Sequence, residues 1–167
     1  MNKKVDRNYL EIQSLDDLVE SKNPSNQFII GLIDPSNFQL NKFFYTQIGK
    51  KHHWVDRLTW TDKQWIDYTS NKKIKTYVLK KQEDLVGYYE LILHFDKSET
   101  EIAYLGILEE YHNQKLGSFL LSSAIKNSFL SNPKRVWVHT CSLDHKNALK
   151  NYLSRGMKIF KSEIVKI

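Results

Sequence analysis

The chain has 167 residues, of which 41% are hydrophobic and 13% aromatic, and a formal net charge of +6. This composition is ordinary for a globular protein, and the length fits a single domain over residues 1–167. No apolar run reaches the length of a membrane-spanning helix. The single cysteine, Cys141, excludes an internal disulfide and predicts a soluble protein of the reducing cytoplasm.

The positive charge favours anionic partners, nucleic acids among them. The cations are mostly lysines scattered along the chain, and only four residues are arginine. Because arginine is favoured for base edges and planar phosphate contacts, a nucleic-acid-binding domain is the remote alternative, and nucleic acid is not the expected partner. A basic surface also attracts an anionic cofactor.

The first part of the chain predicts two strands followed by two helices. Residues 5–13 alternate weakly between apolar and polar side chains, and residues 28–33 form a short apolar run bounded by turn residues. From residue 37 to residue 70 the pattern is helical and rich in aromatic side chains. Thr61 or Asp62 is a suitable N-cap for the second helix.

The rest of the chain alternates between a period of two and a helical period. The expected elements are strands at 76–80, 85–95 and 101–108, a helix at 116–130, a strand at 135–141, a helix from Asp144 to Arg155, and a strand at 157–167. The near-continuous apolar run at 101–108 suits a central strand buried on both faces. The order predicts an α/β domain with one mixed sheet flanked by helices.

Three pieces between Thr100 and Gly156 resemble the core of the GNAT acetyltransferase superfamily. Residues 101–107 (E-I-A-Y-L-G-I) resemble the fourth strand of that fold. Residues 116–121 (L-G-S-F-L-L) resemble the end of its pyrophosphate loop, Q/R-x-x-G-x-G/A, and the helix that follows. Residues 144–157 resemble its N-x-x-A-x-x-x-Y-x-x-x-G-F element, here shifted to N-A-x-x-x-Y. The three occur in the family's order, which implies the GNAT acyl-CoA N-acyltransferase fold.

The resemblance implies transfer of the acetyl group from acetyl-CoA, the co-substrate, to a primary amine by direct attack, without a metal. Residues 52–60 and 87–91 resemble a bacterial branch of unknown substrate, so the acceptor is left open between a small molecule and a protein. A non-catalytic acyl-CoA-binding regulatory module on the same fold is the alternative. A homodimer is left open, and no membrane partner is expected.

The implied cofactor site is the N-terminus of the helix that starts near Leu116. A helix N-terminus offers unpaired N–H groups and a positive dipole end to a pyrophosphate, and Gly117 lets the backbone approach closely. An ungapped match places His112 at the family's Gln or Arg and Lys115 at its first glycine. The N–H of Leu105 is the implied oxyanion donor. The implied cofactor-binding residues are Leu105, Gly106, Ile107, His112, Asn113, Gln114, Lys115, Leu116, Gly117, Ser118 and Asn147.

The resemblance implies Glu101 as the base that takes a proton from the ammonium substrate and Tyr152 as the acid that protonates the leaving thiolate. Glu101 lies four residues before Leu105, about 13 Å along a strand, so it acts through water. Glu90 is a competing base, because a charge in the apolar strand 88–93 is costly unless it is paired or functional. The ordinary alternatives are a surface glutamate for Glu101 and an amphipathic core tyrosine for Tyr152.

In the family, the first two helices wall the acceptor pocket, which implies substrate contacts for His53, Arg57 and Trp60. Core packing is the ordinary alternative for the tryptophan. Residues 139–145 hold the residue types of a cysteine hydrolase, but neighbours on one strand point to opposite faces, so no catalytic triad is expected. His52-His53 and the single cysteine lack a zinc-ligand spacing, so no metal site is expected.

Overall fold

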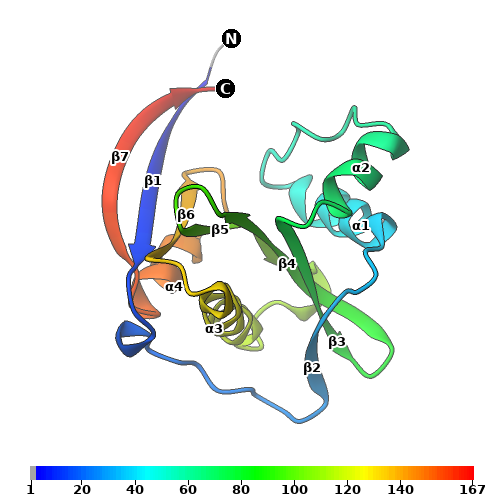
Figure 1. The fold of residues 1–167 in the computed structure, drawn as a ribbon, viewed down its shortest axis with the longest axis horizontal. Helices are drawn as coiled ribbons and strands as arrows, with labels where there is room; N and C mark the ends of the chain where they lie inside the picture. The colour runs from blue at the N-terminus through cyan, green and yellow to red at the C-terminus, as the bar shows by residue number, and fades with distance from the viewer. Residues whose placement is uncertain (1–2) are drawn as a thin grey trace.

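The computed structural model describes residues 3–167, whose seven strands form one mixed sheet flanked by helices (Figure 1). The predicted α/β architecture is therefore confirmed. The strands are β1 (Lys4–Ile12), β2 (Phe28–Leu32), β3 (Ile74–Lys81), β4 (Asp84–His94), β5 (Glu99–Ile107), β6 (Arg135–Cys141) and β7 (Lys158–Lys166). The helices are α1 (Phe38–Gly49), α2 (Asp62–Thr69), α3 (Leu116–Ser128) and α4 (Ala148–Ser154).

Local signals in the sequence set most element ends. The bounds of β6 are those predicted, and Thr61 caps α2 in a capping box with Gln64. The helix expected from Asp144 is shorter than predicted, because α4 begins only at Ala148. The Asp144 carboxylate instead accepts hydrogen bonds from the Thr140 hydroxyl and the Cys141 backbone N–H, so it closes the turn after β6.

The strand order of the sheet is β2-β3-β4-β5-β6-β1-β7. The N-terminal strand β1 lies between β6 and the C-terminal strand β7, antiparallel to both. In Figure 1 these two terminal strands form an arm at the left, and α1 and α2 lie at the right. No helix within residues 3–167 is long and apolar enough to cross a bilayer.

The two central strands β5 and β6 are the one parallel pair of the described sheet, and they pair over a short distance. The ladder joins Glu99 to Arg135, Thr100 to Val136, and Glu101 to Trp137, and then stops. Both strands continue beyond it, β5 to Ile107 and β6 to Cys141. The two strands therefore separate, and the second half of β5 has no strand partner on the β6 side.

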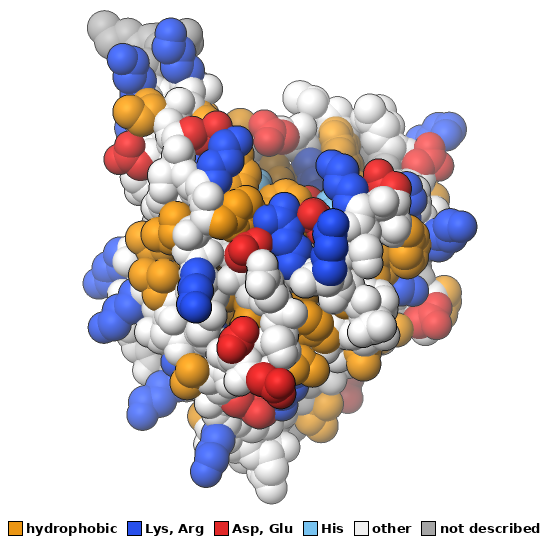
Figure 2. All heavy atoms as spheres, turned by 60° about the vertical axis from the view of Figure 1, so that its left-hand side comes forward, with side chains coloured by type: hydrophobic (Ala, Val, Ile, Leu, Met, Phe, Trp, Pro, Cys, Tyr) orange, Lys and Arg blue, Asp and Glu red, His pale blue; other side chains and the backbone are white. Residues whose placement is uncertain are grey.

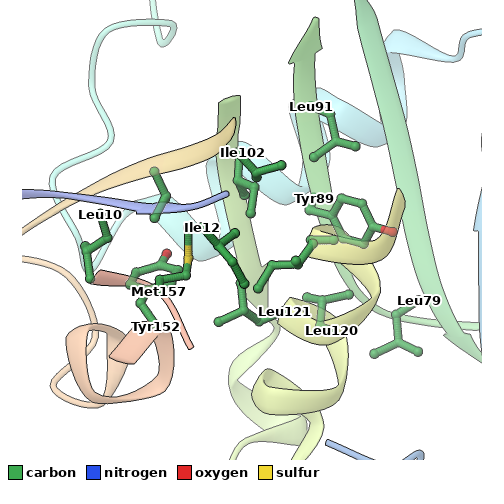
Figure 3. Packing of buried hydrophobic residues seen from close by; sticks show 14 of the residues in the cluster. Leu10, Ile12, Leu79, Tyr89, Leu91, Ile102, Leu120, Leu121, Tyr152 and Met157 are labelled. Carbon is green, nitrogen blue, oxygen red and sulfur yellow. The ribbon is translucent and has the colours of Figure 1, made fainter. Parts of the chain in front are cut away.

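The larger hydrophobic core lies between the sheet and the pair α3 and α4. Figure 3 shows Leu120 and Leu121 of α3 near Ile12 and Ile102 of the sheet. A smaller core packs α1 on the other face, around residues that include Phe44, Val78 and Tyr88. Successive residues of β4 enter different cores, as the alternation of a strand requires.

Candidate active site

A cavity of about 1140 Å³ opens where β5 and β6 separate. Its walls come from the N-terminal end of α3, from α4, from the segment between α1 and α2, and from β1 and β6. Figure 2 shows lysine and arginine side chains around a hollow beside the β1–β7 arm. One cavity thus brings together the segments that are expected to bind the cofactor, to transfer protons and to bind the acceptor.

The loop before α3 leaves the start of that helix open. Asn113 and Lys115 adopt the left-handed conformation, with φ of 64° and 62°. No side-chain hydrogen bond caps α3, so its first N–H groups keep their donor capacity. Gly117 lines the cavity, and a Cβ there would meet only the amide nitrogen of Asn151 within 4 Å, at 3.8 Å. An uncapped helix N-terminus with open space in front of it fits a pyrophosphate.

All the predicted cofactor-binding residues except Gln114 line this cavity. Leu105 and Ile107 lie on the part of β5 that has no partner on the β6 side. Gly106 has a packing role in addition, because a Cβ there would lie 2.7 Å from Cγ2 of Ile48 on α1. The assignment of these residues to a cofactor stays a prediction.

A β-bulge in β5 determines which way Glu101 faces. Ile102 and Tyr104 pair with consecutive residues of β4, so Ala103 between them is the extra residue. A bulge shifts the alternation of side chains by one residue. Glu101 and Tyr104 therefore face the side of the sheet on which α1 packs.

Glu101 lines the cavity with 14% of its side chain exposed, and its Oε1 lies 3.0 Å from Nε2 of His94 on β4. The His94 ring stacks on Trp137 of β6, with ring centroids 6.1 Å apart and an interplanar angle of 17°. This stacking and the hydrogen bond hold the imidazole against the carboxylate. A carboxylate and an imidazole in contact have the chemistry needed to accept a proton from an amine.

Tyr152 lies in the larger core with 8% exposure, and it also lines the cavity. Burial, together with the smaller effect of the Asp144 charge, raises the pKa of its phenol above the ordinary value. The phenol is therefore protonated throughout the physiological pH range, as an acid must be. Its role as the acid stays a prediction.

Glu90 is fully buried and does not line the cavity. Its carboxylate accepts hydrogen bonds from Arg57 Nη1 at 2.9 and 3.1 Å, from the Asn41 amide at 2.8 Å and from the Tyr68 hydroxyl at 3.0 Å. These hydrogen bonds and the ion pair with Arg57 thus offset the free-energy cost of burying a carboxylate in this apolar strand. The geometry favours a structural role for Glu90 over that of a base.

The predicted acceptor residues differ in their surroundings. His53 and Arg57 line the cavity, whereas Trp60 does not and packs edge-on against Trp65 with ring centroids 4.9 Å apart. Arg57 is only 7% exposed, and its guanidinium lies over aromatic rings in addition to its pairing with Glu90. Those rings belong to Tyr45, Trp60, Trp65, Tyr68 and Tyr104. Arg57 is therefore held by the protein itself.

Among the further residues that line the cavity, and that sequence reasoning did not place in the site, are Arg7 of β1 and His139 and Cys141 of β6. They meet because Arg7 pairs with Cys141 and Tyr9 pairs with His139. The alternation of residues 5–13 signals that Arg7 and Tyr9 share a face. No local signal indicates that this strand lies beside β6.

No group of three or more His, Cys, Asp or Glu residues within residues 3–167 is arranged to hold a metal ion. His52, His112 and His145 do gather at the cavity, with ring centroids of the last two 5.1 Å apart. Desolvation, followed by the neighbouring His112 and His52, lowers the pKa of His145.

Comparison with solved structures supports the fold. A GCN5-related N-acetyltransferase from Sphaerobacter thermophilus has a TM-score of 0.73 at 13% identity, covering 99% of this chain and 52% of that chain. One from Kribbella flavida has a TM-score of 0.69 at 14% identity, covering 96% and 56%. The ribosomal-protein-S18-alanine N-acetyltransferase from Escherichia coli has a TM-score of 0.59 at 13% identity, covering 77% and 76%.

At these identities the likeness shows the fold, and the chain spans 52–65% of the length of the first four of these structures. No curated protein matches the chain in sequence. Residues 37–157, which run from the start of α1 to the end of α4, match the model of the Acetyltransferase (GNAT) family. The chain belongs to the GNAT acetyltransferase family.

Proposed function

We propose that the chain is an N-acetyltransferase that transfers the acetyl group of acetyl-CoA to a primary amine. The observation that carries the proposal is the cavity between β5 and β6, which both the uncapped N-terminus of α3 and the carboxylate of Glu101, hydrogen-bonded to His94 behind it, border. The helix N-terminus is suited to bind an anionic cofactor, and the carboxylate is suited to accept a proton. A module that only binds acyl-CoA has no need of a proton acceptor.

The residues proposed to hold acetyl-CoA are those around the start of α3 and the unpaired half of β5. The first N–H groups of α3, Gly117 and Ser118 among them, bind the pyrophosphate, and the Lys115 ammonium adds positive charge. The free side of β5 at Leu105–Ile107 offers backbone groups to the pantetheine arm, with the Leu105 N–H directed to the thioester carbonyl. Bound acetyl-CoA supplies the activated acetyl group.

The chain's own groups move the protons. Glu101 takes a proton from the ammonium form of the acceptor through a water molecule, and His94 holds its carboxylate in place. The free amine then attacks the thioester carbonyl, and the thiolate leaves. Tyr152 protonates that thiolate, and the proton that the attacking nitrogen loses as the amide forms restores the phenol. The acceptor is an amine of a small molecule or a protein, and we expect a cytoplasmic enzyme.

The test is an assay of free-thiol release from acetyl-CoA with a panel of amines, polyamines, aminoglycosides and peptides. Turnover with at least one amine, reduced by Glu101→Gln and unaffected by the exposed-site control Glu83→Gln, supports the proposal. Acetyl-CoA should also raise the melting temperature more than unrelated nucleotides do. At a hundredfold excess over Kd, a ligand that binds only the native state adds about 2.7 kcal/mol to the free energy of unfolding. Binding without turnover on the whole panel would favour the non-catalytic module.

A further inference from the structure

The four arginines of the chain differ in whether the protein neutralises them. Arg57 pairs with Glu90, and Arg135 pairs with glutamates of β1 and β5. Arg7 and Arg155 make no ion pair with any residue in the described range 3–167, and the Nε atom of each is buried without a hydrogen-bond partner there. Both of them line the cavity between β5 and β6. Both side chains are only partly buried, but a buried Nε–H without a hydrogen-bond partner is costly, so a ligand in the cavity is expected to supply one.

Arg7 lies on the acceptor side of this cavity. Arg7 and Tyr9 share one face of β1, and the Tyr9 ring lies 5.6 Å from the His139 ring and 6.4 Å from the Trp137 ring. Trp137 in turn stacks on His94, the partner of Glu101. Arg7 therefore shares the sheet face of Glu101. Arg155, by contrast, follows α4 on the side where the cofactor is proposed to lie.

The charged and titratable neighbours of Arg7 leave its charge available. Glu163 of β7 pairs with it in the sheet register, but that carboxylate accepts a 2.7 Å hydrogen bond from the Tyr9 hydroxyl and lies 3.5 Å from the Lys161 ammonium. Desolvation and, second, the charge of Arg7 lower the pKa of His139, so its imidazole is neutral at physiological pH. The pKa of Glu163 is lowered first by the Tyr9 hydrogen bond and last by the charge of Arg7, and these two residues of the described range form no ion pair, so Arg7 can still bind an anion.

We propose that Arg7 binds an anionic group, a carboxylate or a phosphate, on the acceptor, so that the substrates are primary amines that also carry a negative charge. The proposal rests on the acetyltransferase function above and specifies its acceptor. The planar guanidinium fork matches both anions, and the contact is stronger in a partly desolvated cavity than in water. Arg7 thus fixes one end of the acceptor while the amine lies toward Glu101.

The strand register sets the length of acceptor that fits. Glu101 pairs with Trp137, whereas Arg7 pairs with Cys141, four residues farther along β6. Four residues span about 13 Å of a strand, and the reach of the arginine side chain shortens that separation. An acceptor with its amine and anion several bonds apart is therefore favoured over an α-amino acid.

The test compares hexylamine, 6-aminohexanoate, 6-aminohexyl phosphate and glycine as acceptors. The wild-type protein should prefer the two long anionic amines over hexylamine, and the comparison of carboxylate with phosphate identifies the anion. Arg7→Gln should raise KM for the anionic amines by about 10- to 100-fold, the range for a charged hydrogen bond, and should change KM for hexylamine and for acetyl-CoA far less. Arg7→Lys should retain part of the preference. Lys63→Gln, which removes an equal charge from the exposed face of α2, should retain all of it.

Turnover of hexylamine equal to that of the anionic amines in the wild type, or a rise in the acetyl-CoA KM in Arg7→Gln, overturns the role of Arg7 and leaves the acetyltransferase function intact. Absence of turnover with every amine overturns that function instead. An NMR titration that follows the Arg7 Nε–H resonance of the wild-type protein then tests whether Arg7 binds an anion, and it depends neither on activity nor on the folding of a variant. A shift on adding 6-aminohexanoate but not hexylamine supports the anion site, and no shift at saturation rejects it.

Discussion

The Glu101 carboxylate, which lines the cavity, lies 3.0 Å from the imidazole of His94 on the neighbouring strand β4. The pair links the last residue of β4 to the first part of β5, beside the turn that joins them, and the Trp137 ring of β6 stacks on the imidazole. A base that is oriented by a second group loses less entropy when it accepts a proton. The arrangement gives His94 a positioning role.

Glu101→Gln should lower kcat/KM by about 10²-fold or more and flatten the rising limb of the pH–rate profile, since it removes the base. His94→Gln should cause a smaller loss and retain that limb, because Glu101 is still present. Both effects are measured as kcat/KM for the amine with acetyl-CoA at saturation, and Glu83→Gln serves as the exposed control. Full activity of Glu101→Gln would reject Glu101 as the base.

Tyr152→Phe should lower kcat more than it changes KM, by roughly 10²-fold if proton donation to the thiolate matters. The substitution removes only the hydroxyl and keeps the ring that packs in the larger core, so the fold should be retained. Tyr77→Phe is the matched control, because Tyr77 does not line the cavity. Equal kcat for the two variants would reject Tyr152 as the acid and leave it only a packing role in the core.

The secondary structure, including the start of α3, was predictable because its signals are local. The capping box of Thr61 and Gln64 and the apolar run of β5 each depend on a few neighbouring residues. The motif at the start of α3 likewise carries Gly117 in its own turn. Such patterns report backbone geometry directly.

What the sequence did not predict has a different origin, namely contacts between residues far apart in the chain. Arg57 and Glu90 are 33 positions apart, so their buried ion pair could not be inferred from either segment alone. Arg7 reaches the cavity only because β1 inserts between β6 and β7. No periodicity within a segment encodes which strand it will pair with.

Glu90→Gln should destabilise the protein by about 3–5 kcal/mol, because it leaves the buried Arg57 guanidinium without its counter-charge. The double variant Arg57→Met with Glu90→Gln should recover part of that loss, since the unpaired charge is gone. Urea unfolding measures both. If Glu90→Gln instead keeps full stability and loses turnover, Glu90 is the base and the structural role is wrong.

Tyr88→Phe should stabilise the protein slightly at pH 7 and more strongly at alkaline pH. Its hydroxyl is buried and has no hydrogen-bond partner within residues 3–167, and an unsatisfied hydroxyl costs about 1–3 kcal/mol. Burial raises its pKa well above the ordinary value, so the native state keeps a proton that the unfolded state releases above about pH 10. The free energy of unfolding therefore falls as the pH rises through that region.

Urea unfolding of wild type and Tyr88→Phe at pH 7 and at high pH checks this sign. The loss of stability between the two pH values should be smaller in the variant, with the remainder due to other buried tyrosines such as Tyr89, whose pKa is also raised by burial. A variant that loses more stability than wild type at high pH would contradict the assignment.

Lys115 combines two opposing effects at the start of α3. Its left-handed backbone, with φ of 62°, costs a non-glycine residue about 1–2 kcal/mol, whereas its ammonium attracts the phosphates of the cofactor. Lys115→Ala removes the charge and keeps the strain, so it should weaken acetyl-CoA binding and make it less dependent on salt. Lys115→Gly also relieves the strain, so it should stabilise the free protein and bind acetyl-CoA more tightly than Lys115→Ala does.

Calorimetric titration of the Lys115 variants with acetyl-CoA at low and high ionic strength separates the effect of charge from that of strain, with Lys63→Ala as the control. If both variants bind as tightly as wild type at every ionic strength, the ammonium faces solvent, and the N–H groups of α3 hold the pyrophosphate by themselves.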